Sequence, residues 1–183
     1  MLFRSVSIVE ASTGTLLVTC GRPGRGQATA VAFSRDNARI VTATSADHEG
    51  PIRIYDTDTG AEVARLRGDH YGVEFATYTP DGKRIIFMRP RNVTIWTPET
   101  NDVITIPAQQ NFVSIAMAPD GRRFATASED TVARIWDANT GQRIAAFRGH
   151  GGPLTEVAFV WQRSVPRGVR ARHDCQLATA SRD

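Results

Sequence analysis

Three residues near the end of the chain are of the types that a serine hydrolase uses. His150, Ser181 and Asp183 could act as general base, nucleophile and orienting acid. A hydrolytic serine, however, needs an exposed and strained position beside oxyanion donors. Ser181 instead closes residues 176–181, a run that is typical of a β-strand. The sequence therefore predicts no catalytic residue here, and we expect these three side chains to be structural.

A second stretch, Asp56-Thr57-Asp58-Thr59-Gly60, has the spacing with which a calcium loop begins. An EF-hand loop also needs a bidentate glutamate at its twelfth position, which in this chain is Arg67. A hairpin turn that ends in a left-handed glycine explains the stretch better. The sequence thus predicts neither a metal nor a cofactor.

Residues 113–150 contain the elements that would position such side chains. Residues 113–117 alternate in polarity, Pro119-Asp120-Gly121 suits a tight turn, and β-branched and aromatic residues are concentrated in 132–136. A loop that ends in Gly141 then leads to a last apolar run. We expect one four-stranded antiparallel sheet with strands at 113–117, 124–128, 132–136 and 142–147.

A single sheet of this kind exposes two faces, so it must stack on copies of itself, and the copies are present. Ile54-Tyr55-Asp56, Ile95-Trp96-Thr97 and Ile135-Trp136-Asp137 recur at steps of 41 and 40 residues. A period near 40 with four strands per unit, closed by Trp-Asp and Gly-His pairs, resembles the WD40 repeat of β-propellers. The resemblance covers essentially the whole chain and is weakest for residues 73–107.

The resemblance implies an all-β fold of the WD40 β-propeller type, in a single domain over residues 1–183. It has about four blades' worth of four-stranded antiparallel sheets, so we expect an open arc or a part of a larger ring. The expected parts are strands c and d of a first blade (1–26), a blade (27–70), a degenerate blade (71–112), a blade (113–150), and strands a and b of a last blade (151–183) with an inserted basic loop (160–175).

Three arrangements of these parts stay open. The chain can be a piece of a longer product, it can pair its terminal strands with those of a second copy, or it can close into a four-blade ring. The first is favoured because WD40 rings usually have six to eight blades, as the resemblance implies. Self-association through the terminal strands follows from the second.

In complete WD40 repeats a His, a Ser or Thr, an Asp and a Trp form a hydrogen-bonded tetrad that locks the blade corners. The resemblance carries these roles to incomplete sets, so we expect weaker networks than the family standard. Tyr55 and Asp56, like Trp136 and Asp137, stand at the Trp-Asp position. The sets are His150, Ser181 and Asp183 in the last unit, Ser128, Asp130 and Trp136 in the fourth, and His70 and Trp96 in the third.

Composition limits the other classes of function. The 183 residues carry a net charge of +3, with arginines spread beside acidic residues, which does not favour nucleic-acid binding. The apolar runs are only strand-length, so we expect no membrane contact. Cys20 and Cys175 lack metal-ligand spacing, and the chain starts with no secretory leader, which together predict a cytoplasmic protein.

We therefore expect a non-catalytic scaffold that binds protein partners of unknown identity through the blade-rim loops. One alternative is a sensor or regulatory propeller of a larger signalling protein, such as a kinase or NTPase. Another is an enzyme that uses the axial channel, but the expected inner strands carry no His and no Asp. The expected contact residues, of types common in binding hot spots or at charged rims, are His70, Tyr71, Arg89, Arg91, Phe112 and Glu129.

Overall fold

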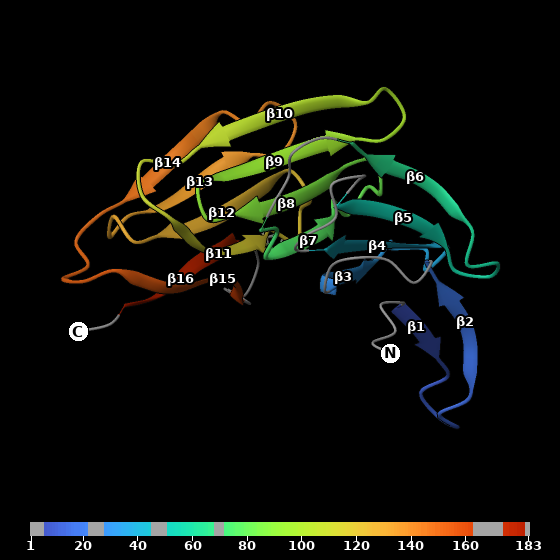
Figure 1. Cartoon of the computed structure of the whole chain (residues 1–183). Coiled ribbons are helices and arrows are strands. Elements are labelled where there is room, and N and C mark those ends of the chain that lie inside the picture. The colour runs from blue at the N-terminus through green and yellow to red at the C-terminus, as the bar shows by residue number, and fades with distance from the viewer. Residues whose placement is uncertain (1–5, 22–27, 45–50, 68–71, 163–173, 182–183) are drawn as a thin grey trace, which may run out of the picture. The chain divides into compact units, whose positions relative to one another are not determined.

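The computed structural model describes residues 6–21, 28–44, 51–67, 72–162 and 174–181. Every regular element in these ranges is a β-strand, and each strand pairs antiparallel with the next in its sheet (Figure 1). The predicted all-β fold with four-stranded antiparallel sheets is confirmed. The described part of the chain offers no helix that is long and apolar enough to cross a membrane.

The chain divides into two compact units, Met1–Ile106 and Pro107–Asp183. The first unit begins with a two-stranded sheet and continues with two four-stranded sheets, β3-β4-β5-β6 and β7-β8-β9-β10. Its strands are β1 (Val6–Val9), β2 (Leu16–Cys20), β3 (Ala28–Phe33), β4 (Arg39–Thr44), β5 (Ile52–Asp56), β6 (Glu62–Leu66), β7 (Phe75–Tyr78), β8 (Ile85–Arg89), β9 (Asn92–Thr97) and β10 (Asp102–Pro107).

The second unit holds one four-stranded sheet, β11-β12-β13-β14, and a two-stranded sheet, β15-β16. Short polar turns join consecutive strands of the larger sheet, so each strand lies beside its neighbour in the sequence. The strands are β11 (Phe112–Met117), β12 (Arg123–Ser128), β13 (Ala133–Asp137), β14 (Arg143–Phe147), β15 (Leu154–Gln162) and β16 (Asp174–Ser181).

The core of each unit lies between stacked sheets. In the first unit Val41 and Ile54 of one sheet pack with Ile85 and Phe87 of the next. On the opposite face of that first sheet, Ile40 and Tyr55 belong to a smaller cluster with the β1–β2 hairpin. Apolar side chains are thus buried on both faces of the β3–β6 sheet, whereas a lone sheet would expose both faces to water.

The core of the second unit is built largely from alanine. Ala125 and Ala127 of β12 and Ala133 of β13 form a cluster with Leu154 and Val157 of β15. Small side chains on one sheet allow the larger Leu154 and Val157 to pack closely against it. This face of the sheet is therefore filled, and Ser114 of β11 adds a polar contact there, since its Oγ accepts a hydrogen bond from the backbone N–H of Val157 at 3.3 Å.

The inserted segment of the last unit is shorter than the predicted loop 160–175. Strand β15 continues to Gln162 and β16 begins at Asp174, with Val160 opposite Gln176 and Trp161 opposite Cys175. Val and Trp favour strand conformation, so the antiparallel pairing extends beyond the point at which the repeat pattern is lost. The rest of the insertion, residues 163–173, lies outside the described residues.

Candidate functional site

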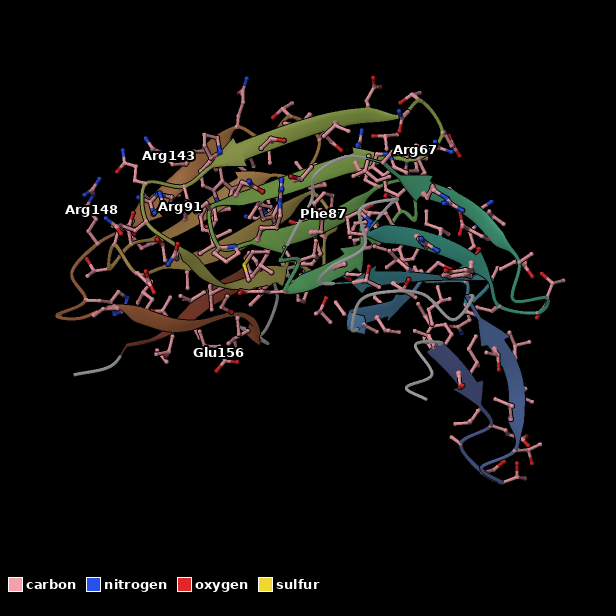
Figure 2. All side chains as sticks on the ribbon, viewed as in Figure 1. Arg67, Phe87, Arg91, Arg143, Arg148 and Glu156 are labelled. Atoms are coloured by element: carbon pink, nitrogen blue, oxygen red, sulfur yellow. The ribbon has the colours of Figure 1, made fainter. Side chains whose placement is uncertain are left out.

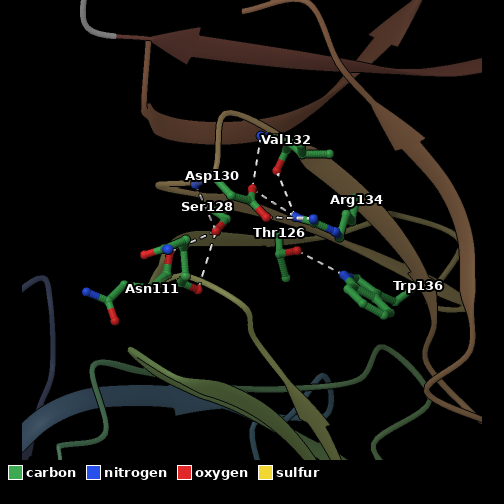
Figure 3. A network of polar contacts seen from close by, with 8 residues as sticks. Asn111, Thr126, Ser128, Asp130, Val132, Arg134 and Trp136 are labelled. Carbon is green, nitrogen blue, oxygen red and sulfur yellow. Dashed lines mark hydrogen bonds and ion pairs between the residues drawn. The ribbon is translucent and has the colours of Figure 1, made fainter.

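A polar network occupies one face of the β11–β14 sheet (Figure 3). The indole Nε1–H of Trp136 donates a hydrogen bond to Thr126 Oγ1 at 2.9 Å, and the indole stacks on Phe124 with 6.4 Å between ring centroids. Phe124 lies directly opposite Trp136 in the β12–β13 pairing, so Thr126, two residues further, is its diagonal neighbour on the same face. The indole thus pairs with Thr126 and not with Ser128, the hydroxyl expected from the tetrad.

Ser128 has a different role at the corner of the sheet. Its Oγ–H donates to the carbonyl oxygen of Asn111 at 3.0 Å, and the backbone N–H of Asp130 donates to the same Oγ at 3.4 Å. Ser128 is buried at the end of β12, beyond the last β12–β13 pair, Thr126 with Arg134. It therefore ties the segment before β11 to the turn after β12.

Asp130 forms a two-point ion pair with Arg134. Nη1 of Arg134 lies 3.0 Å from Oδ1 and Nη2 lies 2.6 Å from Oδ2, while the N–H of Val132 donates to Oδ1 at 3.1 Å. Burial alone would raise the pKa of the Asp130 carboxyl, but the hydrogen bonds from Arg134 and Val132 outweigh it, so the pKa is lowered. Asp130 is thus held ionised.

These residues border a pocket with a volume of about 170 Å³. Phe112 and Trp136 supply apolar wall, Ser128 and Asp130 supply oxygen atoms, and the segment 107–109 lies along one side. Three guanidinium groups also line it. They belong to Arg134 in β13, Arg143 in β14 and Arg148, which follows β14 directly. The pocket therefore combines an aromatic wall with an excess of positive charge.

The sheet β15-β16 also uses a threonine hydroxyl in a side-chain contact. Thr179 Oγ1 lies 2.8 Å from Nε2 of His150. Thr179 stands in the run Ala178-Thr179-Ala180-Ser181 as Thr126 stands in its own Ala-Thr-Ala-Ser run. The side chain of Ser181 and the whole of Asp183 lie outside the described residues, so their predicted roles stay predictions.

In the sheet β7–β10 an apolar residue takes the place of that threonine. Ile85 lies opposite Trp96, which puts the fully buried Phe87 at the diagonal position. The indole Nε1–H of Trp96 donates instead to Oδ1 of Asn101 at 3.2 Å. Asn101 has a φ of 60°, so it occupies the left-handed position of the hairpin turn, which Gly60 and Gly141 occupy in the other sheets and which asparagine also tolerates.

The predicted contact residues fall into different settings. Arg91 and Glu129 are exposed, in the first and the second unit respectively. Arg89 is half-buried, with its guanidinium carbon 5.9 Å from the centroid of the Phe87 ring, and burial lowers its pKa. The predicted contacts at His70 and Tyr71 lie outside the described residues.

Phe112 was expected in a contact surface, and the structure corrects that expectation. Its side chain is only 3% exposed. It begins β11 directly opposite Ser128, so strand geometry holds the ring against the sheet, where it forms pocket wall. Sequence alone placed it in a connecting loop, and the strand begins one residue earlier than expected.

Asp56 and Asp137 stand at the Trp-Asp position of their sheets. Each accepts hydrogen bonds within the hairpin turn that follows it. Oδ1 of Asp56 accepts from the N–H of Thr59 at 2.9 Å and from its hydroxyl at 2.7 Å, and these bonds lower the pKa of Asp56. Asp137 accepts from the N–H of Thr140 at 2.8 Å in the same way. Among the described residues no group of three or more His, Cys, Asp or Glu is arranged to hold a metal ion.

Repeated four-stranded antiparallel sheets, stacked through apolar faces and with an aromatic residue near the end of each third strand, define a repeat protein of the β-propeller class. Residues 101–137 match the family model described as "WD domain, G-beta repeat". The repeats, the sheets and this match all agree with the predicted resemblance to WD40-repeat propellers, of which the chain has a part.

Three relatives show how far the similarity extends. The chain is 29% identical over 175 residues to the human angio-associated migratory cell protein, covering 93% of this chain and 38% of the relative. It is 25% identical over 128 residues to the serine-threonine kinase receptor-associated protein of Gallus gallus, covering 69% and 35%. It is 38% identical over 69 residues to the guanine nucleotide-binding protein subunit beta of Arabidopsis thaliana, covering 35% and 18%. The chain thus spans well under half the length of these relatives.

Proposed function

We propose that the chain is a non-catalytic protein-interaction module of the WD40 type. The proposal rests on one observation: side chains of the types that could act in catalysis form contacts with other residues of the fold. His150 contacts Thr179, Asp130 is paired with Arg134, and Asp56 caps a hairpin turn. Side chains engaged in this way hold strands and corners together, whereas a catalytic group must be available to a substrate.

The relatives support the same proposal. One is named as associated with a kinase receptor and another as a subunit of a guanine nucleotide-binding protein. Both names describe proteins that work in contact with other proteins. For this chain, the exposed Arg91 and Glu129 are the proposed contact residues that remain at the surface.

Affinity capture with the chain as bait tests the proposal. We expect at least one protein to be retained by the wild type and lost when Arg91→Glu and Glu129→Arg are introduced together. A matched variant, Arg35→Glu with Glu99→Arg, changes the same charges at exposed residues and should retain it. A set of captured proteins that is indifferent to both variants would contradict the proposed contact residues.

Self-association is a second proposal, and it rests on the edges of the two-stranded sheets. Among the described residues β1 pairs only with β2, and β16 pairs only with β15. The order inside the complete sheets would let β15-β16 of one copy and β1-β2 of another form a sheet of four strands. We expect a dimer by light scattering after size exclusion, and a monomer at all concentrations would overturn this proposal.

A cytoplasmic location is also part of the proposal. Cys20 is a buried free thiol, which is usual for proteins of reducing compartments. Fractionation of cells that express a tagged chain should recover it with cytoplasmic markers, and recovery in a secreted or membrane fraction would contradict this location.

A further inference from the structure

Strand pairing brings the three arginines of the pocket to one face of the β11–β14 sheet. Arg143 lies directly opposite Trp136, and Ala146 lies directly opposite Arg134. Arg148 follows Ala146 by two residues, which is the spacing that returns a side chain to the same face of a strand. Because Ala146 is small, it leaves space between the arginines, and all three line the same pocket.

The charges of this pocket are not balanced within the described structure. Asp130 is the one carboxylate among the residues that line it, and both of its oxygens are taken by Arg134. Arg143 and Arg148 are exposed and form no ion pair with any described residue. Figure 2 shows these two side chains at the same end of the second unit. Two guanidinium groups are therefore available to an anion.

We propose that the pocket binds the carboxylate side chain of an acidic peptide segment, with Arg143 and Arg148 as its donors and Trp136 as the wall against its methylenes. Guanidinium groups match carboxylates through paired N–H donors, and Trp and Arg are enriched at binding hot spots. The inference rests on the proposed protein-interaction function and names the chemistry of the partner.

The size of the pocket agrees with this occupant. Its volume of about 170 Å³ is far above the roughly 10–15 Å³ that one water molecule needs on the same measure, so a side chain of the size of glutamate fits.

The ionised carboxylate of Asp130 reduces the positive charge of the pocket but does not cancel it, because three arginines line the same pocket. The lining therefore attracts an anion overall, and the comparison of a glutamate peptide with a phosphoserine peptide decides between a carboxylate and a phosphoryl ligand.

Fluorescence anisotropy of a labelled peptide that alternates glutamate and glycine tests the proposal directly. The comparison probes are the same peptide with glutamine for glutamate, the same peptide with phosphoserine, and single-stranded oligouridine. We expect the glutamate peptide to bind and the glutamine peptide not to bind. Phosphoserine or oligouridine binding more tightly at the same site would overturn the assignment of a carboxylate ligand.

A charge-reversal variant locates the binding. Arg143→Glu with Arg148→Glu changes only exposed side chains, so the fold should persist, and binding of the glutamate peptide should weaken by about tenfold or more. The matched control is Arg67→Glu with Arg122→Glu, which reverses two exposed arginines that do not line the pocket. An equal loss in the control would mean that binding follows net charge, and would overturn the proposal.

The indole of Trp136 provides a second readout inside the pocket. In ¹⁵N-labelled protein its N–H signal, assigned with Trp136→Phe, should shift when the glutamate peptide is added and stay in place in the Arg143→Glu/Arg148→Glu variant. Peptide binding that leaves this signal unmoved would overturn the pocket as the site.

The outcomes separate this inference from the proposed function. If affinity capture retains a protein through Arg91 and Glu129 while the glutamate peptide does not bind, the acidic-ligand inference fails and the interaction function stands. If the peptide binds through Arg143 and Arg148 while no protein is captured, the pocket stands and the proposal for Arg91 and Glu129 fails.

Discussion

Two sheets of the same topology provide different hydrogen-bond acceptors for the indole of their tryptophan. In β11–β14 the indole N–H of Trp136 donates to Thr126 on the neighbouring strand at 2.9 Å. In β7–β10 the indole of Trp96 donates to Asn101 in the following hairpin turn at 3.2 Å. The position of Thr126 is taken in the second case by Phe87, which has no group that can accept a hydrogen bond.

The comparison shows that the sheet does not depend on one particular polar contact. A buried indole N–H must find an acceptor, but either the adjacent strand or the turn can supply it. When the strand supplies a phenylalanine, the face becomes apolar core. When it supplies Thr126 and Ser128, the face carries two hydroxyl groups, and Ser128 borders a pocket together with Arg134. The two sheets thus illustrate a structural version and a version suited to binding.

The apolar version should be the most sensitive to truncation. Phe87 is 0% exposed, so Phe87→Ala removes a whole buried ring and should lower the free energy of unfolding by about 3–5 kcal/mol. Urea denaturation followed by circular dichroism measures the change. Phe33→Ala is the matched control, because Phe33 is 47% exposed, and should cost less than about 1 kcal/mol. Equal losses in the two variants would contradict the assigned core.

The polar version should depend on the hydroxyl of Thr126. Thr126→Val keeps the shape of the side chain but leaves the buried indole N–H of Trp136 without its acceptor. We expect a loss of about 1–3 kcal/mol in the free energy of unfolding. The double variant Thr126→Val/Trp136→Phe removes both partners, so the two changes should be less than additive. Full additivity would show that the 2.9 Å contact contributes nothing.

Acid should weaken the Asp130–Arg134 pair. The pKa of Asp130 is lowered in the folded protein, because the bonds from Arg134 and Val132 overcome the effect of burial. Its stabilisation, about 1 kcal/mol for a partly exposed pair, is therefore fully present above the unfolded value of about 3.9. It is lost as the pH falls through the lower folded value.

The measurement is the difference in unfolding free energy between wild type and Asp130→Asn across this pH range. The difference should shrink on acidification below about pH 4. Arg134→Met removes the other partner of the pair. The difference in unfolding free energy between wild type and Arg134→Met should therefore also shrink over the same pH range. An advantage that grows as the pH falls would contradict the predicted direction of the pKa shift.

The smallest effect is expected at the hairpin turn of β9–β10. Asn101→Gly removes the acceptor of Trp96 but relieves the cost of a φ of 60° in a residue with a side chain. These terms oppose each other and are each about 1 kcal/mol, so the net change should lie within about 1 kcal/mol of zero. Calorimetry that finds a loss comparable to that of Phe87→Ala would mean that the turn, and not the core, holds this sheet.

Much of the fold follows from the periodic spacing of the sequence. The Ile-Tyr-Asp and Ile-Trp motifs place the third strand of each sheet, and Gly60, Asn101 and Gly141 mark the left-handed turns, as the structure has them. Such features are predictable because strand propensity and turn chemistry act within a few residues.

The pocket could not be derived in the same way, because it depends on pairing register. The β13–β14 pairing shifts between Ile135 and Trp136, so that Arg143, and not Ile144, lies opposite Trp136. A bulge of this kind changes which side chain faces the sheet. Register likewise selects Thr126 over Ser128 as the acceptor of the Trp136 indole. The two hydroxyls lie two residues apart and therefore on the same face, so the alternation of the strand does not distinguish them.

The indole N–H signals of Trp96 and Trp136 in ¹⁵N-labelled protein, assigned by tryptophan substitution, report on the two acceptors separately. We predict that Thr126→Val shifts the Trp136 signal alone and that Asn101→Gly shifts the Trp96 signal alone, because the two acceptors serve different sheets. A Trp136 signal that is unmoved by Thr126→Val, or a Trp96 signal that is unmoved by Asn101→Gly, would contradict the comparison on which the account rests.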